Sequence, residues 1–344
     1  MRARPSESLI LVTPYLAGAN NGNWRTAARW ARMLAARYRV TVAPPDAPLP
    51  GDATALVALH ARRSRDAIAR WRTAHPDRAT IVVLTGTDLY RDLPAGDRDA
   101  AASIAEADRL IVLQPEALAS LGAAERARTS VVVQSARALA PCTRKAASRF
   151  HALLVAHLRG EKDPVTALEA WRRLPHDHAA TLTIVGAALE APLADAVRRA
   201  AAADPRVRWL GGRPHAWTRQ AIRRTHALIV TSRLEGGANV VVEALTSGTP
   251  VIATRIPGNI GLVGADYGAL FPVGDASALA DLVARAARDR RWLAARAREC
   301  ARAGARMTPE AEARSLEAAV DAAIAARRRG ARIPARRTPS PAKP

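Results

Sequence analysis

The sequence predicts an α/β protein made of two successive doubly wound domains that face a central cleft. Short runs of β-branched and aliphatic residues alternate with alanine-rich amphipathic stretches, which is the pattern of β-α units and parallel sheets. The alternation occurs as two series, interrupted at residues 139–149 by a proline and a small basic cluster. A chain of 344 residues is long enough for two domains of ordinary size.

Each series predicts six strands with helices between them. In the first series the strands are expected at residues 9–13, 39–43, 55–60, 80–85, 110–114 and 131–135, and the clearest helices at 24–36 and 66–74. In the second series the strands are expected at residues 152–157, 181–186, 207–210, 227–231, 251–253 and 269–272. The cleft between two such domains is the expected ligand site.

The end of the chain differs in composition from both series. Residues 277–328 are almost purely helical in character, and we expect them to pack against one or both domains. Residues 329–344 form a basic, proline-containing tail whose composition is typical of disorder. We therefore divide the chain into an N-terminal domain at 1–145, a C-terminal domain with a helical end at 146–328, and the tail.

The overall composition is that of a globular protein outside membranes. Hydrophobic residues make up 49% of the chain and charged residues 24%, and no apolar run approaches the roughly 20 residues that a membrane span requires. The apolar run at residues 9–12 is too short for a signal peptide. Cys142 and Cys300 are far apart and form no Cys-x-x-Cys pair, which argues against a disulfide framework or a zinc site. We expect a cytoplasmic protein.

The net charge of +21 suggests anionic ligands. Of the 52 basic residues only Lys145, Lys162 and Lys343 are lysine, and the arginines are spread along the whole chain. This distribution is more typical of a chain that is rich in arginine throughout than of a protein with a localised nucleic-acid-binding face. A basic nucleic-acid-binding protein stays as an alternative, and it predicts steeply salt-dependent binding to DNA or RNA.

The most informative segment is residues 232–245, which directly follows a predicted strand. Glu235 and Glu243 stand eight residues apart, with Gly236 and Gly237 between them. Asn239 is a suitable N-cap for the helix that follows, and the glycine turn is expected to aim backbone N–H groups into the cleft. Carboxylates accept hydrogen bonds from sugar hydroxyls. The alternative is that Glu243 only complements the helix dipole and Glu235 is solvated.

Glu235 and Glu243 resemble the Glu-x7-Glu signature of family 4 glycosyltransferases, which have the two-domain GT-B fold. Residues 245–253 are similar to the helix, turn and strand that follow this signature, and residues 268–271 to a later glycine-containing strand entry. The resemblance implies that Glu243 binds the ribose of a nucleotide sugar and that Glu235 contacts the donor sugar. Gly236 and Gly237 would supply backbone contacts.

A second element of the resemblance lies at residues 155–162. Lys162 matches the family lysine that holds the donor diphosphate, and its ammonium would offset the charge that develops on the leaving UDP. The family arginine is His157 here, so either this histidine donates to the phosphate in the right protonation state or Arg159 replaces it. The alternative for His157 is a structural histidine at the end of a strand.

Two loops of the N-terminal half also follow predicted strands. Residues 18–23 form a glycine-containing loop, and we expect Asn20, Gly22, Asn23 and Arg25 to hold an anion there. The loop lacks Gly-x-Gly-x-x-Gly, so it does not predict a dinucleotide site. At residues 84–90, Thr87 and Asp88 stand where the family often carries a histidine that faces the reacting carbon. An active-site role and a turn capped by Asp88 both fit this segment.

Across the chain except the tail, the segments at 20–26, 30–32, 84–90, 113–115, 133–136 and 157–164 resemble the selenosugar synthases. This branch joins selenium from selenophosphate to the anomeric carbon of a UDP-sugar such as UDP-N-acetylglucosamine, in the pathway to selenoneine. The resemblance implies these two small-molecule partners. Selenophosphate is a soft anionic nucleophile, so it needs positive potential rather than a strong general base.

No Asp-x-Asp or other metal motif is present, and we expect no cofactor and no metal. The nearest alternative function is a conventional family 4 enzyme that passes sugar to a hydroxyl of a lipid or saccharide. A lipid acceptor predicts an amphipathic docking helix with an aromatic edge. The sequence shows no such helix, and we expect no stable association with a membrane or with nucleic acid.

Overall fold

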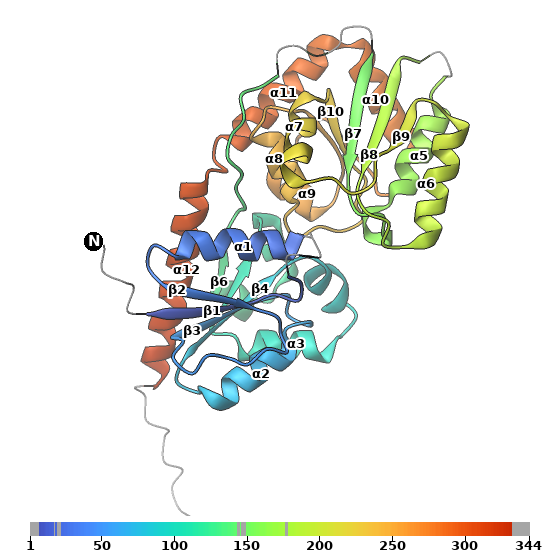
Figure 1. Ribbon diagram of the computed structural model, residues 1–344. Helices are drawn as coiled ribbons and strands as arrows, with labels where there is room; N and C mark the ends of the chain where they lie inside the picture. Colours follow the sequence, from blue (N-terminus) through green and yellow to red (C-terminus); the bar gives the residue numbers. More distant parts are fainter. Residues whose placement is uncertain are drawn as a thin grey trace, which may run out of the picture.

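The computed structural model describes residues 7–16, 18, 22–142, 145, 149–175 and 178–331; for residues 330 and 331 it describes the backbone alone. It has two domains, each built on a six-stranded sheet in which every pair of neighbouring strands is parallel (Figure 1). The two predicted doubly wound domains are therefore confirmed.

The first domain has the strand order β2-β1-β3-β4-β5-β6. Its elements are β1 (Ser8–Val12), α1 (Gly22–Leu34), β2 (Arg39–Ala43), β3 (Ala55–Leu59), α2 (Arg65–Ala74), β4 (Ala79–Leu84), η2 (Asp88–Asp92), α3 (Arg98–Glu106), β5 (Arg109–Val112), η3 (Pro115–Ser120), α4 (Ala123–Ala127) and β6 (Thr129–Val131). The last strand ends where the sequence analysis expected it to begin, because the chain leaves the sheet after residue 131 to cross to the second domain.

The second domain has the strand order β12-β11-β10-β7-β8-β9. Its elements are β7 (Phe150–Val155), η4 (Gly160–Lys162), α5 (Pro164–Arg173), β8 (Ala180–Val185), α6 (Ala191–Ala203), β9 (Val207–Trp209), α7 (His215–Arg224), β10 (Ala227–Val230), α8 (Asn239–Leu245), β11 (Val251–Thr254), α9 (Pro257–Val263), β12 (Leu270–Phe271), α10 (Ala276–Arg288) and α11 (Arg290–Gly304). Helix α12 (Pro309–Ala331) follows them.

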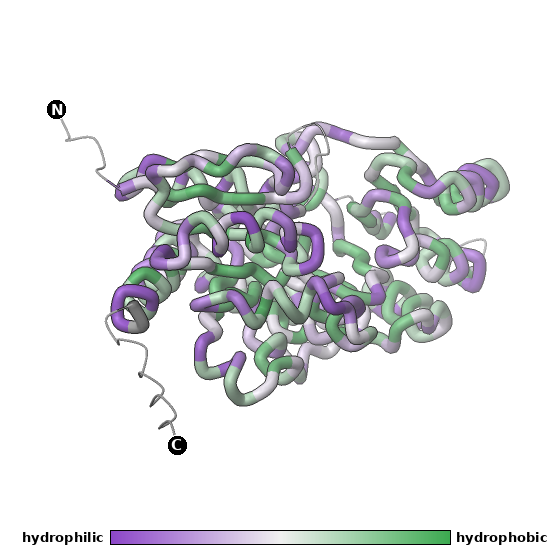
Figure 2. Tube along the Cα trace, turned by 90° about the horizontal axis from the view of Figure 1, so that it is seen from below, coloured by the Kyte–Doolittle hydropathy of each residue, from purple (hydrophilic) through white to green (hydrophobic). Residues whose placement is uncertain are grey.

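The apolar runs of the sequence become the cores of both domains. In β1, Leu9 and Leu11 belong to the cluster on one face of the sheet, and Ile10 belongs to the cluster on the other face. A parallel sheet covered by helices on both faces requires such continuous apolar runs, since successive side chains point to opposite faces. Figure 2 shows hydrophobic segments (green) running through the interior and hydrophilic ones (purple) gathered at the outer turns.

Both sheets reverse their strand order at one point. In the first sheet the reversal lies between β1 and β3, and in the second between β7 and β10. Ligands of doubly wound sheets bind beyond the carboxyl ends of the strands at such a point, because the flanking loops there diverge and leave a crevice. The two crevices face each other across the contact between the domains.

The domains approach each other closely at three glycines. A Cβ atom on Gly236 would lie 2.2 Å from the carbonyl oxygen of Thr85, and one on Gly86 would lie 2.7 Å from the amide nitrogen of Gly236. A Cβ atom on Gly237 would lie 2.7 Å from Cβ of Leu113. Only glycine permits this approach between the loop after β4 and the loop before α8.

Helix α12 returns to the first domain, whereas the sequence analysis assigned residues up to 328 to the second (Figure 1). Its apolar residues belong to the core of the first domain: Leu316, Ala319, Val320, Ala323 and Ile324. The helix also runs to Ala331, so the first three residues of the expected disordered tail are helical, and the rest of the tail lies outside the described residues. An amphipathic pattern predicts an apolar face but does not say which domain covers it.

A buried carboxylate fixes the start of α12. Glu312 is 1% exposed and accepts hydrogen bonds from Nε1 of Trp30 (2.7 Å), from Nε of Arg29 (2.9 Å) and from the backbone N–H of Ser135 (2.8 Å). The guanidinium of Arg29 continues across the domain contact and donates to Oδ1 of Asn239 at 3.2 Å. One carboxylate therefore joins α1, the chain crossing and α12.

Replacing Glu312 by alanine is expected to lower the free energy of unfolding by about 3 kcal/mol, because it leaves the mostly buried Arg29 guanidinium without its counter-charge. Denaturant unfolding measures this loss. Glu310→Ala removes an exposed carboxylate from the same helix turn and should change stability by no more than about 0.5 kcal/mol. Equal stabilities for the two variants would contradict the role of Glu312.

Replacing Gly236 by alanine is expected to push the domains apart, since its Cβ would overlap the backbone of Thr85. Small-angle X-ray scattering should then give a larger radius of gyration than for the unmodified protein. The matched control is Gly51→Ala, whose Cβ meets no atom within 4 Å. An unchanged radius in the Gly236 variant would show that this contact does not set the domain arrangement.

Candidate active site

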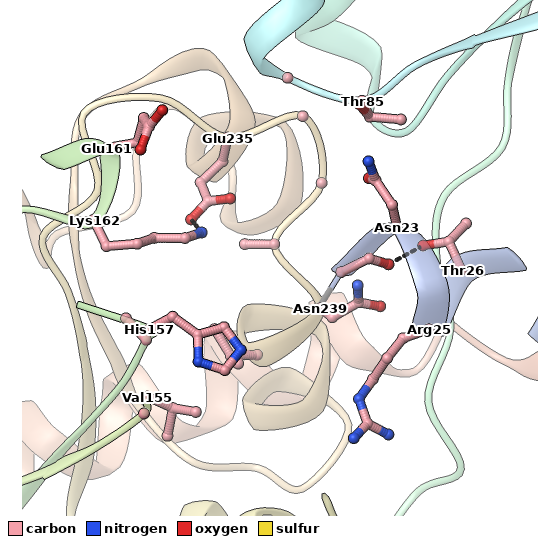
Figure 3. Close-up of a pocket in the computed structure, with 18 of the residues that line it drawn as sticks. Asn23, Arg25, Thr26, Thr85, Val155, His157, Glu161, Lys162, Glu235 and Asn239 are labelled. Carbon is pink, nitrogen blue, oxygen red and sulfur yellow. Dashed lines mark hydrogen bonds and ion pairs between the residues drawn. The ribbon is translucent and has the colours of Figure 1, made fainter. Parts of the chain in front are cut away.

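A cavity of about 250 Å³ lies between the domains at the carboxyl edges of both sheets. The first domain contributes the region after β1, the start of α1 and the loops after β3 and β4. The second domain contributes the loops after β7, β8, β9 and β10, and the start of α8. Figure 3 shows side chains of both domains pointing into this space. The expected cleft site is thus present in the structure.

Lys162 and Glu235 face each other across the second-domain side of the cavity (Figure 3). Nζ of Lys162 lies 2.5 Å from Oε1 of Glu235, and Oγ of Ser232 donates to the same oxygen at 2.7 Å. The side chains of Lys162 and Glu235 are 20% and 11% exposed, so the ion pair is only partly screened by water. This pairing was not evident from the sequence, because 73 residues separate the two side chains.

Glu243 lies in α8 and is 6% exposed. Its Oε1 atom lies 2.5 Å from Nε2 of His215, at the start of α7. Arg25 approaches from the first domain: burial lowers the pKa of its guanidinium, and the charge of Glu243 opposes this shift. The sequence analysis named Glu243 and Arg25 but missed His215, because only the tertiary structure places α7 beside α8.

His157 follows β7 and its ring lies in the cavity (Figure 3). The backbone N–H of Ala187 donates to Nδ1 of His157 at 3.1 Å. A nitrogen that accepts a hydrogen bond carries no proton, so the neutral ring bears its proton on Nε2. In this tautomer Nε2–H of His157 is a hydrogen-bond donor, and the role of His157 at a phosphate stays a prediction.

Arg159 and Glu161 flank His157 and Lys162 at the cavity wall. Burial opposes ionisation of Glu161, but a backbone hydrogen bond and the charges of Arg159 and Arg91 outweigh it and lower the pKa of its carboxyl group. Nη1 of Arg91 lies 2.9 Å from Oε1 of Glu161, which forms an ion pair between the domains.

The start of α1 also reaches the cavity. Gly22, Asn23 and Arg25 line it, while Asn20 lies outside the described residues. The helix begins at Gly22, and the hydroxyl of Thr26 donates to the carbonyl oxygen of Gly22 at 2.9 Å.

Asn239 does not have the expected capping role. The N-cap of α8 is Ala238, and it makes no side-chain capping hydrogen bond. The side chain of Asn239 is turned instead toward the first domain, where its Oδ1 atom accepts the hydrogen bond from Arg29. The residue still lines the cavity together with Gly236 and Gly237.

Of the two residues proposed after β4, only Thr87 lines the cavity. Asp88 is fully buried, and its carboxylate accepts hydrogen bonds from the backbone N–H groups of Ala61, Thr85 and Gly86 at 2.8 to 2.9 Å. A carboxylate held by several amides fixes the two turns and does not face a ligand. The prediction of a catalytic Asp88 is corrected accordingly, and the alternative of a capped turn describes it.

The sequence analysis also missed cavity residues of the first domain: Tyr15, His60 and Arg63. Thr87 was predicted to lie in the site because it follows a strand and so lies at the carboxyl edge of the sheet. The same argument applies to His60, because His60 directly follows β3, and β3 pairs with β4. Its Nε2 atom lies 2.8 Å from Oγ1 of Thr87. The cavity therefore does contain a histidine on its first-domain side, contributed by a different strand from the expected one.

Within the parts of the chain that the structure describes, no helix is long and apolar enough to cross a bilayer. Among the same residues, no three histidine, cysteine or acidic side chains are grouped as metal ligands.

Residues 143–306 match the family model described as "Glycosyl transferases group 1". A search of curated protein sequences gave no significant match. Among solved structures, HepE from Anabaena in complex with UDP and glucose is similar at a TM-score of 0.76 and 17% identity, covering 92% of this chain and 99% of HepE. Sucrose-phosphate synthase from Thermosynechococcus elongatus gives 0.73 and 17%, covering 93% and 100%.

The pneumococcal O-GlcNAc transferase GtfA, solved with UDP and GlcNAc, is similar at a TM-score of 0.60 and 17% identity over 77% of this chain and 56% of GtfA. At these identities the similarity establishes the fold, which is GT-B, as predicted. The family match lies in the second domain, at residues 143–306. The chain therefore has the GT-B fold, and its second domain carries a match to the glycosyl transferases of group 1.

Proposed function

We propose that this protein is a glycosyltransferase that transfers a sugar from a UDP-sugar, held mainly by the second domain, to an acceptor held at the first domain. One observation carries the proposal: Lys162 and His157, which suit a diphosphate, share one cavity with Glu235 and Glu243, which suit hydroxyl groups. Two of the similar structures, HepE and GtfA, were solved with UDP together with a sugar.

Glu243 is proposed to bind the ribose of the donor. Its carboxylate lies at the carboxyl edge of the second sheet, and the contact with His215 fixes its orientation. A nearly buried carboxylate gains strongly from a hydroxyl donor, because it has little water to exchange for that hydrogen bond. Glu235 is proposed to contact the donor sugar, with backbone contacts from Gly236 and Gly237.

Lys162 is proposed to stabilise the leaving UDP. Negative charge on the leaving diphosphate grows as the bond from the anomeric carbon to oxygen breaks, so a nearby ammonium stabilises the transition state more than the bound donor. Nε2–H of His157 donates to the same diphosphate, and Arg159 adds positive potential at the rim. The ion pair with Glu235 positions Lys162 before the donor binds.

The acceptor is proposed to be selenophosphate, on the resemblance to selenosugar synthases. Its selenium would form a bond to the anomeric carbon as the bond to UDP breaks, and water would then cleave the Se–P bond to release phosphate. Basic residues from both domains line the cavity and suit such an anion: Arg25, Arg63, Arg159, Lys162 and Arg213.

A conventional hydroxyl acceptor is the second candidate, and His60 favours it. A hydroxyl group must lose its proton as it attacks, and an imidazole on the first-domain side of the cavity is a suitable proton acceptor. Selenophosphate has no such requirement.

The test is an anaerobic incubation of the protein with UDP-N-acetylglucosamine and freshly generated selenophosphate, followed by mass spectrometry. We expect UDP and a selenium-containing hexosamine. If UDP-sugar binds but no selenosugar forms, the hydroxyl acceptor becomes the leading candidate. If UDP-sugar does not bind, the assignment of the donor is wrong.

Replacing Glu243 by glutamine is expected to weaken UDP binding about tenfold, because the ribose loses a hydrogen bond to a charged acceptor. Isothermal titration calorimetry measures the change. Asp281→Asn, an exposed site in α10, is the control and should leave the affinity unchanged. A dissociation constant for UDP within twofold of the unmodified protein would remove Glu243 from the ribose site.

A further inference from the structure

The two walls of the cavity differ in charge. Among the described residues that line it, all acidic side chains come from the second domain, and each has a cationic or histidine partner: Glu161 with Arg91, Glu235 with Lys162, and Glu243 with His215. The first-domain lining contains Arg25, Arg63 and His60 but no acidic residue within the described part of the chain. Arg25 interacts with the charge of Glu243, and His60 lies 3.8 Å from the carboxylate of Asp88, so Arg63 is the residue of this wall that supplies net positive charge.

His60 and Thr87 form the rigid part of the first-domain wall. His60 is 2% exposed, and its Nε2 atom lies 2.8 Å from Oγ1 of Thr87. The carboxylate of Asp88 joins the turn after β3 to the turn after β4 through the amides of Ala61 and Thr85. The two side chains are consequently held in a fixed relation before any ligand binds.

The backbone of His60 is strained. Its φ angle is +74°, a conformation that only a small share of residues other than glycine adopts. Such a conformation persists when surrounding contacts impose it, and strained residues of this kind gather at functional sites. Here the imposed geometry directs the imidazole toward Thr87 instead of away from the cavity.

The pair presents hydrogen-bonding groups to a ligand. Nε2 of His60 lies 2.8 Å from Oγ1 of Thr87, and Nδ1 of His60 lies 3.5 Å from the backbone nitrogen of Arg63 and 3.8 Å from Oδ2 of Asp88. In the tautomer with the proton on Nε2, the imidazole donates to Thr87 and the hydroxyl hydrogen of Thr87, which lines the cavity, is available to a ligand. An oxyanion is a strong acceptor for it.

Arg63 supplies the charge beside this donor. Its guanidinium lies 5.1 Å from the ring centroid of Tyr15, which also lines the cavity. In the described parts of the chain Arg63 has this cation–π contact but no ion pair, whereas its neighbour Arg62 is paired with Asp92. The aromatic ring fixes the cation without neutralising it.

We propose that Arg63, Thr87 and His60 form a binding subsite for a phosphate-type oxyanion, and that this subsite holds the acceptor. The proposal rests on the proposed function, since it takes the second domain as the donor side. It assigns the substrate class of the acceptor: a free phosphate-like anion or a molecule that carries a phosphoryl group.

The experiment measures anion binding to protein saturated with UDP, so that the diphosphate site is already filled. Titration calorimetry with inorganic phosphate, and separately with glycerol phosphate, distinguishes a free anion from a phosphoryl group on a larger molecule. We expect saturable binding of at least one of them. Arg63→Gln should weaken it about tenfold, the effect of one lost charge-assisted hydrogen bond, and Thr87→Val should weaken it by a smaller factor.

The matched control is Arg62→Gln, which removes the same charge from the same loop but outside the cavity. It should leave the phosphate affinity unchanged. The affinity for UDP should stay within twofold in all three variants, which also shows that they are folded. Absence of phosphate binding to the UDP complex, or equal phosphate affinities for the Arg63 and Arg62 variants, would overturn the subsite.

The outcome separates this inference from the proposed function. Phosphate binding that depends on Arg63, in a protein that consumes no UDP-sugar with any acceptor, would support the subsite and refute the proposed transfer. Transfer to selenophosphate that is unaffected by Arg63→Gln, with an unchanged KM for selenophosphate, would support the transfer and overturn the subsite.

Discussion

The close approach of Gly236 to the backbone of Thr85 and Gly86 is the constraint on which the active site depends. Without side chains between the two loops, the carboxyl edge of one sheet comes into direct contact with that of the other. This contact places Lys162 and Glu235, which the second domain supplies, opposite Thr87 and the start of α1. Any side chain at this point would separate the two walls of the cavity, and the proposed group transfer requires the two substrates to be within reach of each other.

The charges of the cavity are arranged in two different ways. On the second-domain wall the carboxylates of Glu235 and Glu243 are paired with Lys162 and His215 of the same domain, which fixes their orientation. On the first-domain wall Arg63 stacks near an aromatic ring instead. A donor with hydroxyl groups and a diphosphate matches the first arrangement, and an anionic acceptor matches the second. Both arrangements suit a reaction in which negative charge accumulates between the walls.

Much of this architecture could be predicted from the sequence. The alternation of apolar strands and amphipathic helices defined two doubly wound domains, because local patterning controls which residues can be buried in a parallel sheet. The spacing of Glu235 and Glu243 around two glycines, and a lysine at 162 in a chain almost without lysines, singled out three side chains that line the cavity between the domains. The sequence also placed the loops at Gly22 and Thr87 at the cavity edge of the first sheet. Each loop follows a strand, and the carboxyl ends of parallel strands lie at one edge of a sheet.

The sequence by itself therefore determined the two domains and the edge of each sheet at which the cavity lies, and it named several of the second-domain residues that line this cavity. Only the tertiary structure decided which side chains meet. It showed that Asp88 serves the backbone and that Asn239 reaches Arg29. It also placed His60 beside Thr87 and α12 on the first domain. Helical and strand periodicity specify the face that a residue occupies, whereas contacts between residues far apart in the chain depend on how whole domains pack, and no local pattern encodes that packing.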